Sequence, residues 1–236
     1  MSNALKGIWI LIFAGMLIIG SVVFFTQSQA SQPGEIRVTS SSQTITVDTL
    51  EKMTHQADYI VVGTFEKFDS TWNAARKGDG PDAKPDPRHY AEGRLYDFHV
   101  NEVLKGSIPD RIIKVSIIYA KTEQDLHING RPSRITMRDP HFIAPVFGKK
   151  YILFLTKANN VPPIYGIPFH PYQIQFDDAG KAVLKKPNSQ PMIEKKQFGS
   201  SQVVITHETD FKMNDTITGR DFKEIKAEIL RATKRQ

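Results

Sequence analysis

The chain has 236 residues, of which 40% are hydrophobic and 24% are charged, and this balance is typical of a globular domain that buries a core. It contains no cysteine, which excludes disulfides, thiolate metal sites and a thiol nucleophile. The formal net charge of +6 either favours anionic partners or simply serves solubility, because net charge alone identifies no site.

An apolar segment near the N-terminus predicts export. It runs without charge from Ile8 to Phe25 and follows the positive charge of Lys6. A membrane-spanning helix needs roughly 20 apolar residues and a signal-peptide core about 7–15, so the length favours an anchor. Residues 28–30 (SQA) nevertheless have the form of a cleavage site. We expect residues 1–30 to be a membrane anchor or a signal peptide. In both cases the rest of the chain is extracytoplasmic, either tethered or released near Ala30.

A polar linker and a short helix are predicted next. Residues 31–47 are rich in Ser and Thr and are interpreted as a linker, with a short strand over 36–47 as the alternative. Asp48 has the character of a helix N-cap, with Glu51 three residues later as its capping-box partner. Apolar residues then follow at helical spacing, which predicts a short amphipathic helix over 49–56.

The clearest strand signal is residues 94–106 (RLYDFHVNEVLKG), where Tyr96, Phe98 and Val100 alternate with mostly polar side chains. The alternation then breaks, and we predict a bulge at residues 101–102. Three apolar runs are interpreted as further strands, the first two as sheet neighbours of this one and the third as a buried strand, and Gly63 inside the first indicates a bulge or bend. They are residues 59–65 (YIVVGTF), 111–119 (RIIKVSIIY) and 151–156 (YILFLT).

Loops and shorter elements separate these strands. Residues 69–93 are polar and rich in Gly and Pro, and we expect a mobile insertion there. Asn129-Gly130 predicts a hairpin whose return arm lies at a sheet edge because of Pro132. Shorter strands are expected at 172–176, 183–184 and 203–206, and a helix at 219–232. Strands without alternating helices predict a mainly β fold with flanking helices (α+β), built on an antiparallel sheet or small barrel.

The order of these motifs carries a resemblance. ADYIVVGTF, a strand ending in NEVLKG, a further strand and then GKKYILFL resemble an exported bacterial domain. That domain is similar to the OB-like five-stranded barrels of the tissue-inhibitor and netrin type. The resemblance covers about residues 50–156 and implies a small OB-like antiparallel barrel within one domain, 48–236, that ends in a helix. The resemblance implies no particular activity. The metalloproteinase inhibitors chelate zinc through an N-terminal cysteine of the mature chain, and this sequence has none.

The sequence predicts no catalytic residue, no metal site and no cofactor. None of the seven histidines has metal-binding spacing, and no nucleophile elbow, phosphate-binding loop or dinucleotide fingerprint occurs. One basic stretch remains as a candidate binding site, because guanidinium groups grip phosphates and carboxylates; the alternative is a solvated loop. Its residues are His127, Arg131, Arg134, Arg138 and His141.

These observations favour a non-catalytic extracytoplasmic binding domain, with the membrane as one partner through Ile8–Phe25. Its other partner is expected to be an unidentified protein or an anionic envelope polymer, bound through loops 69–93 and 121–147, and not a nucleic acid. One alternative is a cell-envelope hydrolase, which would need His127, His141 or His170 to meet a carboxylate in a cleft. The other is a protease-inhibitor-like module.

Overall fold

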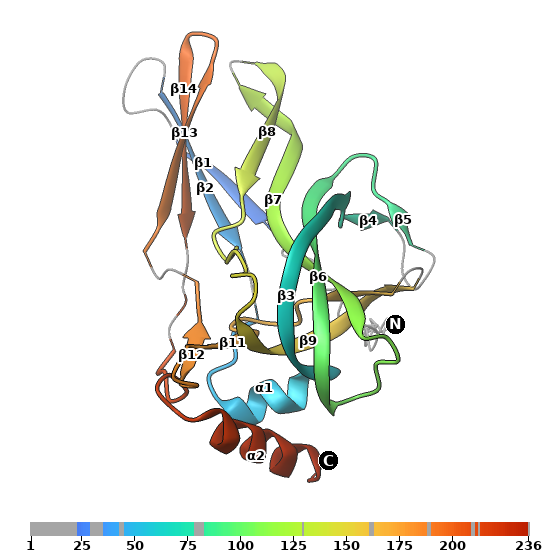
Figure 1. Ribbon diagram of the computed structural model, residues 1–236. Helices are drawn as coiled ribbons and strands as arrows, with labels where there is room; N and C mark the ends of the chain where they lie inside the picture. The colour runs from blue at the N-terminus through green and yellow to red at the C-terminus, as the bar shows by residue number, and fades with distance from the viewer. Residues whose placement is uncertain are drawn as a thin grey trace, which may run out of the picture.

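A computed structural model describes residues 23–28, 35–42, 45–77, 83–128, 130–160, 163–187, 190–208, 211 and 213–235 (Figure 1). Across these residues the chain is mainly β with two helices, which confirms the predicted class. Within this part of the chain, no helix combines the length and the apolar character needed to cross a membrane. The predicted anchor lies almost entirely outside the described residues. Its end is part of strand β1 (Val23–Ser28), so residues 23–25 are extended and not helical.

Five strands pair in a closed ring. β3 pairs antiparallel with β6 and with β9, and β6 pairs antiparallel with β7. β10 then pairs parallel with β7 and antiparallel with β9, so the pairings return to their starting strand. The ring strands are β3 (Tyr59–Asn73), β6 (Tyr90–Lys105), β7 (Ile112–Ile128), β9 (Lys150–Asn160) and β10 (Pro163–Gly166).

Both faces of the ring strands are covered near the helices, which explains their continuous apolar runs. On β3, Val61 and Phe65 point into the ring, while Ile60 and Val62 contact the layer formed by α1 (Leu50–Gln56) and α2 (Phe222–Thr233). The N-cap of α1 is Thr49, whose Oγ1 accepts a hydrogen bond from Lys52 N at 3.2 Å. The predicted cap, Asp48, instead binds the Lys52 ammonium at 2.8 Å.

Bulges bend the long strands. Val62 pairs with Glu102 and Gly63 with Val100, so Asn101 is left out of the register. This confirms the bulges predicted at residues 101–102 and at Gly63. β11 (Gln173–Phe176) and β12 (Ala182–Lys185) extend the sheet from β9, and β8 (Arg131–Arg138) pairs with β7 as the predicted hairpin.

A separate four-stranded sheet stands at the upper left of Figure 1, in the order β1-β2-β14-β13. It contains β2 (Glu35–Ser42), β13 (Met192–Phe198) and β14 (Ser201–Glu208). β2 runs parallel to β14, so residues 35–42 of the predicted linker form a strand whose partner lies far along the sequence. A small third core joins this sheet to the β7–β8 hairpin.

Candidate functional site

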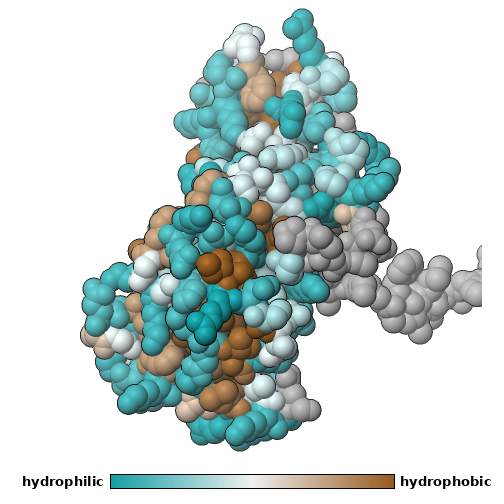
Figure 2. Space-filling view, turned by 45° about the vertical axis from the view of Figure 1, so that its right-hand side comes forward, coloured by the Kyte–Doolittle hydropathy of each residue, from teal (hydrophilic) through white to brown (hydrophobic). Residues whose placement is uncertain are grey.

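Aromatic side chains are exposed where β9 begins and the β3–β6 pair continues beyond it. The pairing of β9 with β3 ends at Lys150 and Thr64, which leaves the inner face of the later part of β3 without that neighbour. Phe68 and Phe147 are 46% and 48% exposed, and their rings lie 5.7 and 6.3 Å from that of Tyr96. We call Phe68, Tyr96, Val146 and Phe147 the ring rim. Figure 2 shows hydrophobic side chains reaching the surface among hydrophilic ones.

Hydrogen bonds hold the rim in place. Gly148 N donates to Phe65 O at 2.9 Å, and Val146 N donates to Tyr151 Oη at 2.9 Å. The turn that carries Phe147 is therefore tied to both β3 and β9. Its apolar surface is displayed on a fixed backbone, which lowers the entropy lost when a partner binds.

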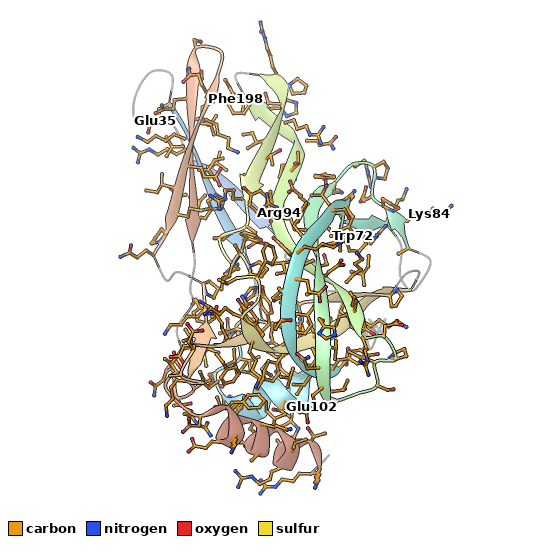
Figure 3. All side chains as sticks on the ribbon, viewed as in Figure 1. Glu35, Trp72, Lys84, Arg94, Glu102 and Phe198 are labelled. Carbon is orange, nitrogen blue, oxygen red and sulfur yellow. The ribbon has the colours of Figure 1, made fainter. Side chains whose placement is uncertain are left out.

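An arginine stack adjoins the rim on the same face of β6. The Arg94 guanidinium carbon lies 3.3 Å from the centre of the Tyr119 ring and 5.4 Å from that of Phe142. Arg138 lies 5.4 Å from the same tyrosine ring. Arg94 Nε also contacts Glu92 Oε1 at 3.2 Å, so its charge is partly compensated. Figure 3 shows Arg94 near the middle of the molecule.

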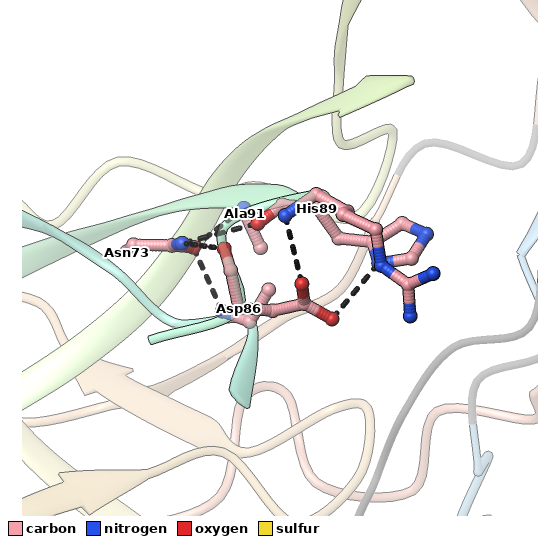
Figure 4. Close-up of polar contacts among 6 residues, drawn as sticks. Asn73, Asp86, His89 and Ala91 are labelled. Carbon is pink, nitrogen blue, oxygen red and sulfur yellow. Dashed lines mark hydrogen bonds and ion pairs between the residues drawn. The ribbon is translucent and has the colours of Figure 1, made fainter. Parts of the chain in front are cut away.

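Hydrogen bonds of the Asn73 side chain hold the two ends of the connection between β3 and β6 together. The Asn73 side chain makes four hydrogen bonds of 3.0 Å, donating to Asp86 O and His89 O and accepting from Ala75 N and Ala91 N (Figure 4). Farther along the same connection, β4 (Arg76–Lys77) pairs with β5 (Lys84–Pro85). The predicted mobile insertion over 69–93 is therefore wrong at both ends, which are strand, and residues 78–82 lie outside the described residues.

Titratable side chains gather between the ring and the four-stranded sheet. They come from β7, the turn after β8, the segment before β11, β13 and β14, and we call them the histidine seam. Its members are Lys121, Asp139, His141, His170, Tyr172, Glu194 and His207.

The contacts within the seam are close. His141 Nδ1 lies 3.4 Å from Asp139 Oδ1, and the His141 and His170 rings are 5.1 Å apart. His207 Nε2 lies 3.4 Å from Glu194 Oε1, but without hydrogen-bond geometry. The buried atoms His170 Nδ1 and Tyr172 Oη have no hydrogen-bond partner within the described part of the chain. A buried polar atom without a hydrogen-bond partner costs free energy, so each one calls for a physical explanation.

Burial controls the ionisation of the seam. It lowers the pKa of His170 to about 3, a change that the neighbouring His141 reinforces and Asp139 opposes. Burial likewise lowers the pKa of His207 and raises that of Tyr172. For Asp139, burial acts to raise the pKa, but the His141 hydrogen bond and the Lys121 charge outweigh it, so its pKa is lowered. At neutral pH the seam therefore holds neutral His170 beside an ionised Asp139.

The structure disperses the basic stretch predicted as a binding site. His127, Arg134 and Arg138 are exposed and fall on one face of the β7–β8 hairpin. Arg131 has the opposite alternation on β8, the face that carries Ile135 and Met137 into the third core. His141 is buried in the seam at 6% exposure. Of the three candidate histidines for a hydrolase, His141 and His170 meet beside the carboxylate of Asp139, and His127 does not join them.

Sequence reasoning missed Tyr172, Glu194 and His207, because strand pairing between distant segments brings them to the seam. No group of three or more His, Asp or Glu side chains within the described ranges could hold a metal ion. Comparisons of the chain with protein-family models, with curated proteins and with solved structures found no match.

Proposed function

We propose that the protein is an extracytoplasmic, non-catalytic binding module built on an OB-like barrel. It is tethered by the segment Ile8–Phe25 or released by cleavage near Ala30. The closed ring of five strands supports the barrel assignment, because OB folds are five-stranded barrels that bind through a sheet face and adjoining loops.

The observation that carries the proposal is the ring rim with its adjoining arginine stack. Aromatic residues and arginine are the side chains most enriched in the centres of protein interfaces. Phe68, Val146 and Phe147 are each more than 40% exposed, although each is held by neighbouring strands. An exposed apolar cluster of this kind marks an interaction surface more often than a scattered single residue does.

Local charges favour a protein partner over an anionic polymer. Lys114 lies 2.5 Å from Asp97 and 2.7 Å from Asp69, and Lys149 lies 2.5 Å from Asp178. These two lysines are thus compensated, whereas polyanion binding needs a surplus of positive charge. The rim therefore recognises a partner mainly through its apolar surface.

Photo-crosslinking on intact cells tests this surface. A photoreactive phenylalanine analogue replaces Phe147 in one variant and Ile193, which is 61% exposed on the four-stranded sheet, in the matched control. We expect one protein adduct at position 147 that persists in 1 M salt and disappears when Phe68→Ser is added. Equal adducts at both positions, or no adduct at 147, would contradict the proposed surface. Loss of the adduct in high salt would favour the polyanion instead.

The location is tested separately with a single cysteine, since the chain has none. Lys195→Cys places a thiol at an exposed position of β13. We expect a membrane-impermeant maleimide to label it on intact cells. Labelling that appears only after lysis would place the domain inside the cell.

One observation favours a second function, hydrolysis, because a carboxylate that orients a histidine is the pair used in general-base catalysis. Asp139 and His141 form such a pair at 3.4 Å. Turnover of p-nitrophenyl acetate above the buffer rate, lost in His141→Gln and kept in His127→Gln, would support it. A rate equal to buffer would remove it.

A further inference from the structure

The four-stranded sheet is held to the rest of the molecule by the smallest of the three cores. Among the residues whose burial the structure describes, that core contains six buried hydrophobic residues, against 17 and 13 in the other two. Val38, Val203 and Ile205 come from the sheet, and the β7–β8 hairpin supplies Ile128, Ile135 and Met137. Regions with few buried apolar contacts open at a lower free energy than the global transition. This junction is therefore the natural place for a local opening.

Polar contacts at the same junction involve titratable groups. Glu194 Oε1 accepts a hydrogen bond from Arg138 N at 3.0 Å, and Lys196 Nζ donates to Thr136 O. Two side chains of β13 thus cover the free backbone edge of β8. Because Glu194 also faces the buried His207, the charge state of this histidine acts directly on the contact between the sheet and the hairpin.

His170 fixes the other end of the junction. Its N–H donates to Ile45 O and its carbonyl accepts from Val47 N, both at 2.9 Å. Residues 45–47 follow β2 and precede α1, so they connect the four-stranded sheet to the helical layer. A movement of the four-stranded sheet that displaces residues 45–47 therefore acts directly on the backbone of His170.

The balance of charge in the seam changes sharply with protonation. With neutral histidines, the cations are Lys121 and Lys196, and the carboxylates that face the same groups are Glu123, Asp139 and Glu194. Protonation of His170 and His207 would place four cations against these three carboxylates in a largely buried space. Uncompensated buried charge is relieved most readily by admitting water.

We propose that mild acid releases the four-stranded sheet from the β7–β8 hairpin, so that the histidine seam works as a pH-operated latch over the third core. Opening exposes His170 and lets it regain the ordinary pKa of 6.5 instead of about 3. At pH 5 the opened form is then favoured about 30-fold relative to neutral pH through His170 alone. His207 adds to this ratio, because its pKa is also lowered by burial.

Amide hydrogen exchange on the full chain at pH 7.5 and pH 5 tests the latch, after correction for intrinsic exchange rates. We expect β2, β13 and β14 to be less protected than β3 and β9 at both pH values, and their protection to fall by about 30-fold or more at pH 5. His170→Gln should abolish most of the fall. His127→Gln, at the exposed tip of the hairpin, should leave it complete.

A second variant covers the case in which His170→Gln does not fold. His207→Gln leaves a neutral polar side chain beside Glu194 that cannot be protonated, so the fall in protection should be smaller than in the natural chain. The latch is refuted if β2, β13 and β14 are protected as strongly as β3 and β9 at pH 5, since all of them would then exchange only through global unfolding. Unchanged protection at pH 5, or the same fall in the seam variants as in His127→Gln, would refute it as well.

Discussion

Replacement of Gly63 by alanine tests the packing of the ring. A Cβ atom at this position would lie 2.0 Å from His99 O and 2.6 Å from Phe98 Cε1. The first contact is to backbone, so β3 and β6 must separate by more than 1 Å at a point where Phe65 and Phe98 are fully buried. Overpacking costs about 1–3 kcal/mol, and each ladder hydrogen bond weakened nearby adds about 0.5–1.5 kcal/mol. We therefore expect the free energy of unfolding to fall by about 3–4 kcal/mol in total.

Urea unfolding followed by tryptophan fluorescence measures this loss, since Trp72 packs beside the same strand pair. Gly180→Ala is the matched control. Its φ is +76° and its surroundings are open, so it should lose only about 1 kcal/mol from backbone strain. A loss for Gly63→Ala below 1 kcal/mol, or no greater than that of the control, would refute the described pairing of β3 with β6.

Three further outcomes are expected. Because the pKa of His170 is lowered from 6.5 to about 3, the folded state binds this proton less well, so stability is complete above pH 6.5 and falls towards pH 3. Urea unfolding at pH 5 should show a loss of about 2 kcal/mol that His170→Gln removes and His127→Gln retains. Asn73→Ala should lower the free energy of unfolding by about 1–3 kcal/mol and speed amide exchange at Ala75 and Ala91, which donate to its side chain. Unchanged exchange would show that Asn73 does not hold the base of this connection. Thr49→Ala should cost about 1 kcal/mol by removing the α1 cap, and a thermal melt equal to that of the natural chain would disprove this.

The sequence predicted the existence of most ring strands but not their lengths. Residues 59–65 and 151–156 are recognisable as strands because both of their faces are buried. Alternate side chains enter different cores, so the whole run is apolar. β3 nevertheless continues to Asn73. Register shifts after Phe65 and Phe68 interrupt the alternation there, so the exposed half of the strand looked like a loop. Bulges preserve pairing while they erase the period of two on which sequence reasoning depends.

The four-stranded sheet was largely missed for a different reason. β2 is rich in Ser and Thr, and it becomes a strand through pairing with β14, which starts at Ser201. No local signal identifies a partner so distant in sequence. The same topology brings His207 and Glu194 to the seam, whereas the predicted basic site assumed that neighbours in sequence share a surface. Alternation on β8 instead separates Arg131 from Arg134 and Arg138.

Closure of the strand ring is the central claim, because it supports the barrel assignment, positions the rim and surrounds the core that contains Phe65. The decisive contact is the parallel pairing of β10 with β7, in which Tyr165 lies opposite Val115 and Ile164 opposite Lys114. Nuclear Overhauser spectra of the amide-labelled domain measure it directly. The account predicts cross-strand contacts between the backbones of residues 164–165 and 114–115. Contacts of β10 with β9 but none with β7 would show an open sheet and contradict the ring.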